Sequence, residues 1–308
     1  MSILTRVVKG KIEKPLRLLV YGVEGIGKSS FAAGAPATIF VGPEDGTTEL
    51  DVTRAPSPEK GDWSWSYVLD TLTELATEKH EYKTVAIDTL DWLEPLCWKH
   101  VCLKGDENGK QKNSIEDFGY GKGFAAALEE WRVFLARLER LRNSRGMNVV
   151  LLAHSWIKPY KNPEGPDYDR HEMKLNAKAS GLLREWCDAV LFANYETFAI
   201  EDKGRVRGVG NNVRYLYTQR SAARDAKNRY DLPEKLPLNW ESFIAAVRAH
   251  RPEEPSKLRE RINEMLTQVK DQDVITRVTA AVSKAAENAA ELARIADHLA
   301  AIVMKESA

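Results

Sequence analysis

The chain has 308 residues, of which 43% are hydrophobic and 29% charged, as expected for a soluble globular protein with one large domain and a small appendage. Lysine plus arginine equals aspartate plus glutamate at 45 each, so net charge indicates no class of partner. No apolar run reaches the roughly 20 residues of a bilayer span, the N-terminus lacks a signal-peptide apolar region, and the three cysteines form no C-x-x-C pair. These features predict a cytoplasmic protein with reduced thiols and no membrane partner.

The first predicted element is a buried strand over residues 16–21, and a helical pattern begins at Ser29. The segment between them matches the phosphate-binding loop G-x-x-x-x-G-K-[ST]: Gly22, Val23, Glu24, Gly25, Ile26, Gly27, Lys28 and Ser29, with Ser30 following. Glycines let such a loop curl until its backbone N–H groups face phosphate oxygens. We therefore expect bound ATP and Mg²⁺, with Lys28 reaching the β- and γ-phosphates and the Ser29 hydroxyl on the metal.

Acidic residues follow the next two predicted strands. The strand over residues 38–41 leads to a Gly-Pro turn and then to Glu44 and Asp45, either of which could activate the attacking water. We favour Glu44 as this base, while a solvated acidic turn is the alternative. The strand over residues 84–87 ends at Asp88, which we expect on the Mg²⁺ side of the nucleotide.

A third polar strand end follows residues 148–153, where His154 is placed to contact the γ-phosphate. Two further strands are predicted over residues 189–193 and 213–218, and helices over 66–78 and 124–141. This alternation of strands and helices predicts an α/β fold with a mostly parallel sheet flanked by helices.

Two long connections interrupt the alternation, at residues 99–123 and 157–179. Each mixes cations and aromatic side chains with acids, and connections this long inside a compact domain are usually functional or disordered. The stretch 195–210 predicts a hairpin that turns at residues 202–204.

Beyond the last core strands, Lys227 and Arg229 are spaced to project to one side of an extended segment. They are candidates for a finger that contacts the γ-phosphate of a neighbouring subunit, or for a solvated basic turn. Three regions are predicted: a core over residues 1–250, a linker over 251–256 and a helical segment over 257–308. The last region carries a heptad-like apolar seam, whose partner is its own first helix, the core or another subunit.

These segments together resemble the RecA-like ATPase core, and within it the phage-encoded single-strand-annealing (Sak) group. The resemblance is carried by YGVEGIGKSS, IFVGPEDG, VAIDTLDWLEP, FGYGKGF, VVLLAHSWIKP, LLREWCDAVLFANYE and AKNRYDLP, between residues 17 and 233. It implies that Glu44 activates water, that Asp88 serves the Mg²⁺ and that Lys227 and Arg229 act as a paired finger. His154 stands where RecA-like recombinases usually carry a glutamine that senses the γ-phosphate.

The resemblance further implies self-association into a ring or filament, with ATP at the subunit interface. It also implies that the two long connections contact single-stranded DNA, where cations would attract phosphates and aromatic side chains would stack on unpaired bases. Plain surface loops are the alternative for both connections. We expect an ATP-dependent single-stranded-DNA-binding recombination or annealing protein whose hydrolysis is coupled to DNA, in a phage host's cytoplasm. A single-strand-binding protein or other recombination factor is a further candidate partner. The alternatives are a helicase or helicase-loader-like ATPase, a nucleotide-gated scaffold with negligible turnover and, more remotely, a small-molecule kinase.

Overall fold

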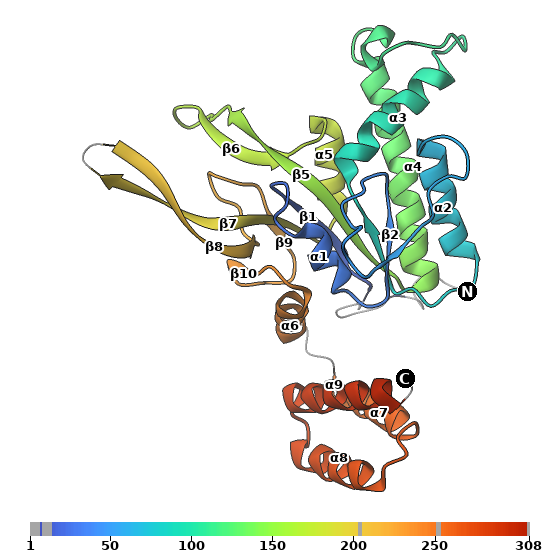
Figure 1. Cartoon of the computed structure of the whole chain (residues 1–308), viewed down its shortest axis with the longest axis vertical. Coiled ribbons are helices and arrows are strands. Elements are labelled where there is room, and N and C mark those ends of the chain that lie inside the picture. The colour runs from blue at the N-terminus through green and yellow to red at the C-terminus, as the bar shows by residue number, and fades with distance from the viewer. Residues whose placement is uncertain (1–6, 8–13, 203–204, 251–253, 307–308) are drawn as a thin grey trace. The chain divides into compact units, whose positions relative to one another are not determined.

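The computed structural model describes residue 7 and residues 14–202, 205–250 and 254–306. The chain divides into two compact units, Met1–Phe243 and Ile244–Ala308 (Figure 1). The first is a mixed α/β unit built around a large sheet, and the second consists of helices. The predicted fold class, an α/β core with a mostly parallel sheet flanked by helices and followed by C-terminal helices, is confirmed.

The central sheet has the strand order β10-β8-β7-β1-β5-β4-β2-β3. Its strands are β1 (Arg17–Gly22), β2 (Thr38–Val41), β3 (Thr53–Arg54), β4 (Thr84–Ile87), β5 (Asn148–Tyr160), β7 (Ala189–Asp202), β8 (Arg205–Tyr217) and β10 (Lys235–Pro237). The six strands from β7 to β3 are parallel, whereas β8 and β10 are antiparallel. Two further strands pair outside this order: β6 (Tyr168–Met173) with β5, and β9 (Lys227–Asn228) with β7.

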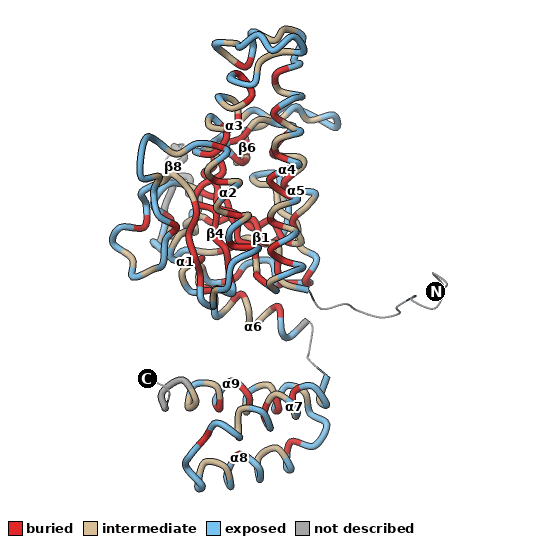
Figure 2. Tube along the Cα trace, turned by 90° about the vertical axis from the view of Figure 1, so that its right-hand side faces the viewer, coloured by how far each residue is buried: buried red, intermediate tan, exposed pale blue. Residues whose placement is uncertain are grey.

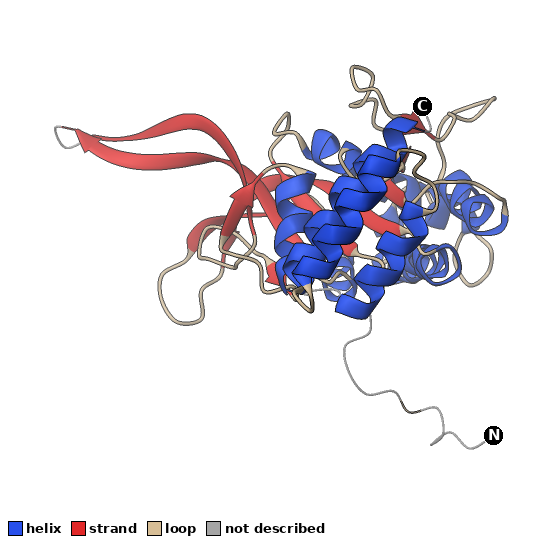
Figure 3. Cartoon of the chain, turned by 90° about the horizontal axis from the view of Figure 1, so that it is seen from below, coloured by secondary structure: helices blue, strands red, loops and turns tan. Residues whose placement is uncertain are grey.

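Helices cover both faces of the parallel strands, as the cartoon seen from below shows (Figure 3). They are α1 (Lys28–Ala33), α2 (Trp65–Thr77), α3 (Leu90–Lys104), α4 (Lys122–Arg145) and α5 (Ala177–Trp186). A further helix, α6 (Trp240–His250), contains the division between the two units. Leu19 and Tyr21 of β1 join the core formed with α2 to α5, while Leu18 and Val20 are equally buried on the other face. Because both faces are covered, the central strands read as continuous apolar runs.

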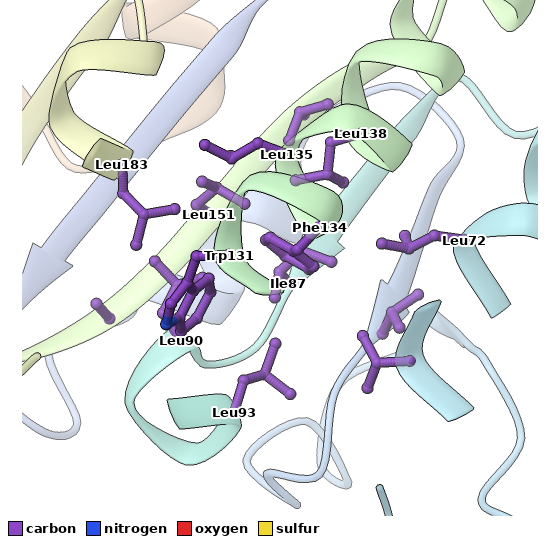
Figure 4. Close-up of a cluster of buried hydrophobic side chains, with 14 of the residues drawn as sticks. Leu72, Ile87, Leu90, Leu93, Trp131, Phe134, Leu135, Leu138, Leu151 and Leu183 are labelled. Carbon is purple, nitrogen blue, oxygen red and sulfur yellow. The ribbon is translucent and has the colours of Figure 1, made fainter. Parts of the chain in front are cut away.

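The larger core lies between the sheet and α2, α3 and α4, where buried residues gather in Figure 2. Trp131 of α4 packs edge-on against Trp65 of α2, with ring centroids 5.0 Å apart, and Phe134 lies 5.6 Å from Trp65. These rings meet the aliphatic side chains of β4 and β5, including Ile87 and Leu151 (Figure 4). This packing fixes the strand ends that carry the functional residues.

The predictions of long loops over residues 99–123 and 157–179 are both partly wrong. Residues 99–104 belong to α3, residues 115–118 form a 3₁₀ turn, and α4 begins at Lys122, which leaves a shorter connection. Residues 157–160 extend β5, and β6 returns antiparallel to it, so this segment is an arm of two strands rather than a loop. The predicted hairpin is confirmed as β7 and β8, although residues 203–204 of its turn lie outside the described residues.

The second unit contains α7 (Pro255–Leu266), α8 (Gln272–Ala285) and α9 (Ala289–Glu306). The predicted seam does not run along one continuous helix, because the chain breaks between α8 and α9 at Ala286, where φ is 44°. Seam residues such as Val278, Leu292 and Leu299 are nevertheless buried, in a cluster that includes Leu258 of α7. Residues 251–253 of the predicted linker lie outside the described residues, and Pro255 already opens α7.

Candidate nucleotide site

The strand order brings the predicted polar strand ends together. β5 lies between β1 and β4, and Gly22 at the end of β1 pairs in register with His154 on β5. Ile87, directly before Asp88, pairs with Leu151 of β5 and with Val41 of β2. In open parallel sheets, ligands bind beyond the carboxyl ends of the strands.

The phosphate-binding loop needs two of its glycines for identifiable reasons. A Cβ on Gly22 would lie 2.1 Å from the carbonyl oxygen of Ala193 on β7, so only glycine fits this approach. Gly27 has a φ of 108°, which places the backbone in the left-handed region directly before α1. The Lys28 ammonium donates to the carbonyl oxygens of Gly22 at 3.3 Å and Val23 at 3.0 Å, and the side chain is buried within the curl of the loop.

Ser29 and Asp88 form the predicted metal-side pair. The Ser29 hydroxyl donates to Asp88 Oδ2 at 2.7 Å, across 59 residues of sequence. Burial raises the pKa of the Asp88 carboxyl to about 6, although the Ser29 hydrogen bond opposes this shift. Burial also lowers the pKa of Lys28, against the attraction of neighbouring carboxylates that include Glu44 and Asp88.

Glu44, just after β2, accepts one hydrogen bond and lies close to the His154 ring. The Thr89 hydroxyl donates to Glu44 Oε2 at 2.5 Å, and His154 Nε2 lies 3.6 Å from Glu44 Oε1. Glu44 lines the cavity beside the phosphate-binding loop, whereas Asp45 lines a neighbouring cavity with Glu44. Of the two candidate bases, only Glu44 therefore faces both the loop and His154.

The carboxylate of Asp91 fixes His154 from the opposite side. The backbone N–H of His154 donates to Asp91 Oδ1 at 2.8 Å, and the ring Nδ1 lies 2.9 Å from Oδ2. The hydrogen bond with Asp91 raises the pKa of His154, although burial opposes it. Burial alone would raise the pKa of Asp91, but the hydrogen bonds from His154 hold it below its ordinary value.

A cavity of about 310 Å³ lies over these groups. Its lining is Gly25, Gly27, Lys28, Ser29, Ser30, Glu44, Gly46, Glu49, Leu50, Asp88 and His154. The curled loop and the buried ammonium suit a phosphate chain, and a hydroxyl beside a carboxylate suits Mg²⁺, which prefers oxygen ligands. Among the described residues no cluster of three or more His, Cys, Asp or Glu could hold a metal, so an ion here would take further ligands from phosphate and water.

Lys227 and Arg229 lie elsewhere. The Lys227 ammonium donates to the carbonyls of Arg184, Glu185 and Cys187 at the end of α5, at 2.9, 2.8 and 2.6 Å. Arg229 Nη1 lies 3.3 Å from Asp188 Oδ1, and its side chain is 54% exposed. β9 pairs with the start of β7, which runs parallel to β1, whereas the phosphate-binding loop follows the end of β1. Both cations therefore lie toward the amino ends of these strands, and the loop lies at the carboxyl ends.

Three residues around the site were not foreseen from the sequence. Thr89 and Asp91 directly follow Asp88, at the start of a helix that comes after a strand. Polar residues in that position are a sequence signal for side chains near the site. Arg214 of β8 donates from Nη1 to the carbonyl of Ile26 at 3.1 Å and so supports the loop from the far strand. Nothing in the sequence near residue 214 indicates that contact.

Residues 14–230, most of the chain, match the AAA domain family, and this range contains every residue of the candidate site. The chain belongs to the AAA domain family. Membership supports a nucleotide-binding P-loop ATPase, an activity that typically uses Mg²⁺. A comparison with curated proteins finds no match. Within the described part of the AAA domain and of the C-terminal unit, no helix has the length and apolar character to cross a bilayer.

Proposed function

We propose that this AAA domain protein couples ATP binding and hydrolysis to the binding of single-stranded DNA, in recombination or strand annealing. The resemblance to the phage Sak group supports this assignment beyond the family. The observation that carries it is one continuous strand, β5, that contributes His154 to the nucleotide site and then leaves the sheet as an arm.

Each site residue has a separate role toward the nucleotide. Bound ATP with Mg²⁺ supplies the triphosphate and the leaving group. Lys28 would hold the phosphates, and Ser29 with Asp88 would orient the metal. Glu44 takes the proton of the attacking water, and His154, oriented by Asp91, reports on the γ-phosphate through its ring Nε2.

The arm supports a role in nucleic-acid contact. Trp156 follows His154 by two residues and is 37% exposed, and Ile157 is 64% exposed. Lys158 Nζ lies 3.7 Å from the centroid of the Trp156 ring, and Tyr160 packs beside Tyr168 at 5.2 Å. Exposed aromatic rings beside cations can stack on unpaired bases while the cations meet phosphates.

Strand β5 itself would couple the nucleotide site to the arm. A shift of His154 toward or away from a γ-phosphate moves the backbone of β5 at Ser155 and Trp156, because strand residues are joined without an intervening hinge. Glu94 of α3 accepts hydrogen bonds from the backbone N–H of Asn176 at 3.0 Å, which ties the helix that carries Asp91 to the segment after β6. Both connections link the nucleotide to the base of the arm.

Assembly is part of the same proposal. A ring or filament would let Lys227 and Arg229 of one subunit reach the nucleotide of the next. Lys227 would first have to leave the carbonyls of α5 that it binds in its own chain. A single-strand-binding protein or another recombination factor would supply or receive the DNA.

The test is the ATPase rate with and without single-stranded DNA, for the native chain, Lys28→Ala and Trp156→Ala. We expect DNA to stimulate the native chain severalfold, Lys28→Ala to be inactive, and Trp156→Ala to keep its basal rate but lose stimulation. Tight ATP binding without turnover in the native chain would instead indicate a nucleotide-gated scaffold. Strand displacement would indicate a helicase, and either result would overturn the proposal.

A further inference from the structure

The C-terminal unit carries a groove that its own small core does not fill. α9 packs against both α7 and α8, and eight buried residues form the core: Leu258, Ile262, Val269, Val278, Ala285, Leu292, Ala296 and Leu299. On α8 only Val278 and Ala285 are buried, while Val274, Ile275 and Val282 are half-buried. The apolar face of α8 is therefore only partly covered.

The groove runs between α8 and α9 and has a volume of about 460 Å³. Its apolar lining consists of Val274, Val278 and Ala281 from α8, and Ile295 and Ile302 from α9. The α8 residues recur at steps of four and three and the α9 residues at seven, so each set forms a stripe along its helix. An apolar channel between two helices suits an amphipathic helix, which places residues of its own repeat into it.

The polar rim of the groove has one predominant charge. Arg277 on α8 and Arg294 on α9 are exposed on opposite walls, and Glu291 is the acid of the lining. Among the described residues neither arginine has a carboxylate partner, and Arg277 donates only to the backbone carbonyl of Asp273 at 3.2 Å.

Other arginines of the same unit are paired. Arg248 lies 2.8 Å from Asp297, and Arg259 lies 3.7 Å from Glu287. The two groove arginines therefore offer charges that the unit itself does not neutralise. Carboxylates of an acidic partner would neutralise these two charges.

We propose that the groove binds an amphipathic, acidic helical segment of another protein. The apolar face of that segment would enter between α8 and α9, and its flanking carboxylates would meet Arg277 and Arg294. A second copy of this chain fits poorly, because a symmetric contact between two grooves would set arginine against arginine. The C-terminal unit is thus a recruitment module for an acidic partner.

The experiment uses the full chain and two labelled helical peptides with the same leucine repeat. One carries glutamate at the flanking positions, and the other carries lysine there. Fluorescence anisotropy should show at least tenfold tighter binding of the acidic peptide, weakened further by added salt. Equal binding of the two peptides, or binding of neither, would overturn the proposal.

Charge-reversal variants locate the binding. Arg277→Glu and Arg294→Glu should each weaken the acidic peptide at least fivefold and strengthen the lysine peptide. Lys284→Glu makes the same change of charge on exposed α8 surface outside the groove lining, and it should leave both peptides within twofold. The basal ATPase rate and the circular dichroism of all three variants should match the native chain. An equal loss in Lys284→Glu would show a diffuse charge effect and contradict the proposed site.

Discussion

Asp91 binds His154 twice, through the backbone N–H at 2.8 Å and the ring Nδ1 at 2.9 Å. The Asp91 and His154 side chains are only 5% and 10% exposed. This pair fixes the ring so that Nε2 faces Glu44 and the cavity. Asp91 is therefore a positioning residue for the γ-phosphate contact that we assign to His154.

Replacing Asp91 by asparagine should make stability depend on pH in a defined way. The pKa of His154 is raised from 6.5 and that of Asp91 lowered from 3.8, so the charged pair stabilises the native chain between these values. Its contribution is lost as pH rises through the raised pKa of His154, and again as pH falls through the lowered pKa of Asp91. We expect Asp91→Asn to lower the free energy of unfolding by about 1.5 to 3 kcal/mol at pH 6.

The loss should be smaller at pH 9, where the native pair has lost its charge–charge component. Urea unfolding at the two pH values measures both differences. His154→Gln provides the comparison, because it removes the titrating ring and should show a loss that changes with pH in the same direction. An Asp91→Asn loss of equal size at both pH values would show that the pair contributes only uncharged hydrogen bonds.

Replacing Asp88 by asparagine should separate stability from activity. Burial raises the pKa of Asp88 from 3.8 to about 6, so ionising it in the folded chain is unfavourable at pH 8. Asp88→Asn should raise the free energy of unfolding of the nucleotide-free chain at pH 8 by roughly 1 to 3 kcal/mol, because one pKa unit corresponds to about 1.4 kcal/mol. The gain should shrink as pH falls below 6, since the native carboxyl is then already neutral.

The same Asp88→Asn variant should lose most Mg²⁺-dependent ATP hydrolysis. Thermal unfolding without nucleotide measures the expected gain in stability, and ATPase rates at saturating Mg²⁺ measure the expected loss of activity. Ser29→Ala is the matched control, because it should lose activity without the stability gain. A destabilised Asp88→Asn chain would mean that the Ser29 hydrogen bond outweighs the penalty of burying the charge.

The close approach at Gly22 gives a steric prediction. In Gly22→Ala the new methyl would lie 2.1 Å from the carbonyl oxygen of Ala193, so β1 and β7 must separate. We expect a loss of stability of about 1 to 3 kcal/mol and weaker ATP binding. Gly181→Ala in α5 meets nothing within 4 Å and should be neutral or stabilising by up to ~1 kcal/mol, as measured by urea unfolding. Equal effects of the two changes would contradict this account of the loop.

Lys227 and Arg229 can be separated by their different contacts. Lys227→Met removes an ammonium from three carbonyls at the end of α5 and should lower the melting temperature by several degrees. Arg229→Ala removes a largely exposed side chain and should leave the melting temperature nearly unchanged. If the pair acts on a neighbouring subunit, Arg229→Ala should still lower the ATPase rate at high protein concentration. An unchanged rate at every concentration would rule out Arg229 as a finger.

The parts of the site that the sequence predicts are those whose chemistry lies within a short stretch. The loop from Gly22 to Ser29 and the strand ending at Asp88 carry their own signals, and the structure brings them together. The contact between Asp91 and His154 spans 63 residues. It depends on β5 lying between β1 and β4, which no local pattern specifies.

The errors also have physical reasons. β6 and the outer half of β5 form an arm away from the central sheet, so residues 157–172 lack the buried apolar run that marks a strand. The apolar spacing of the C-terminal unit persists across the break after Ala285, so the sequence predicts one continuous seam there. Asn288, which accepts a hydrogen bond from the backbone N–H of Glu291 at 3.2 Å, was the signal of a new helix start.

The proposed coupling between the nucleotide and the β5–β6 arm is tested most directly by DNA affinity. Binding of fluorescent single-stranded DNA should be compared with and without a non-hydrolysable ATP analogue, for the native chain and His154→Ala. The account predicts that the analogue tightens DNA binding of the native chain at least tenfold, and that His154→Ala still binds the analogue but shows no such change. An equal response of the two proteins, or a native chain that ignores the analogue, would contradict it.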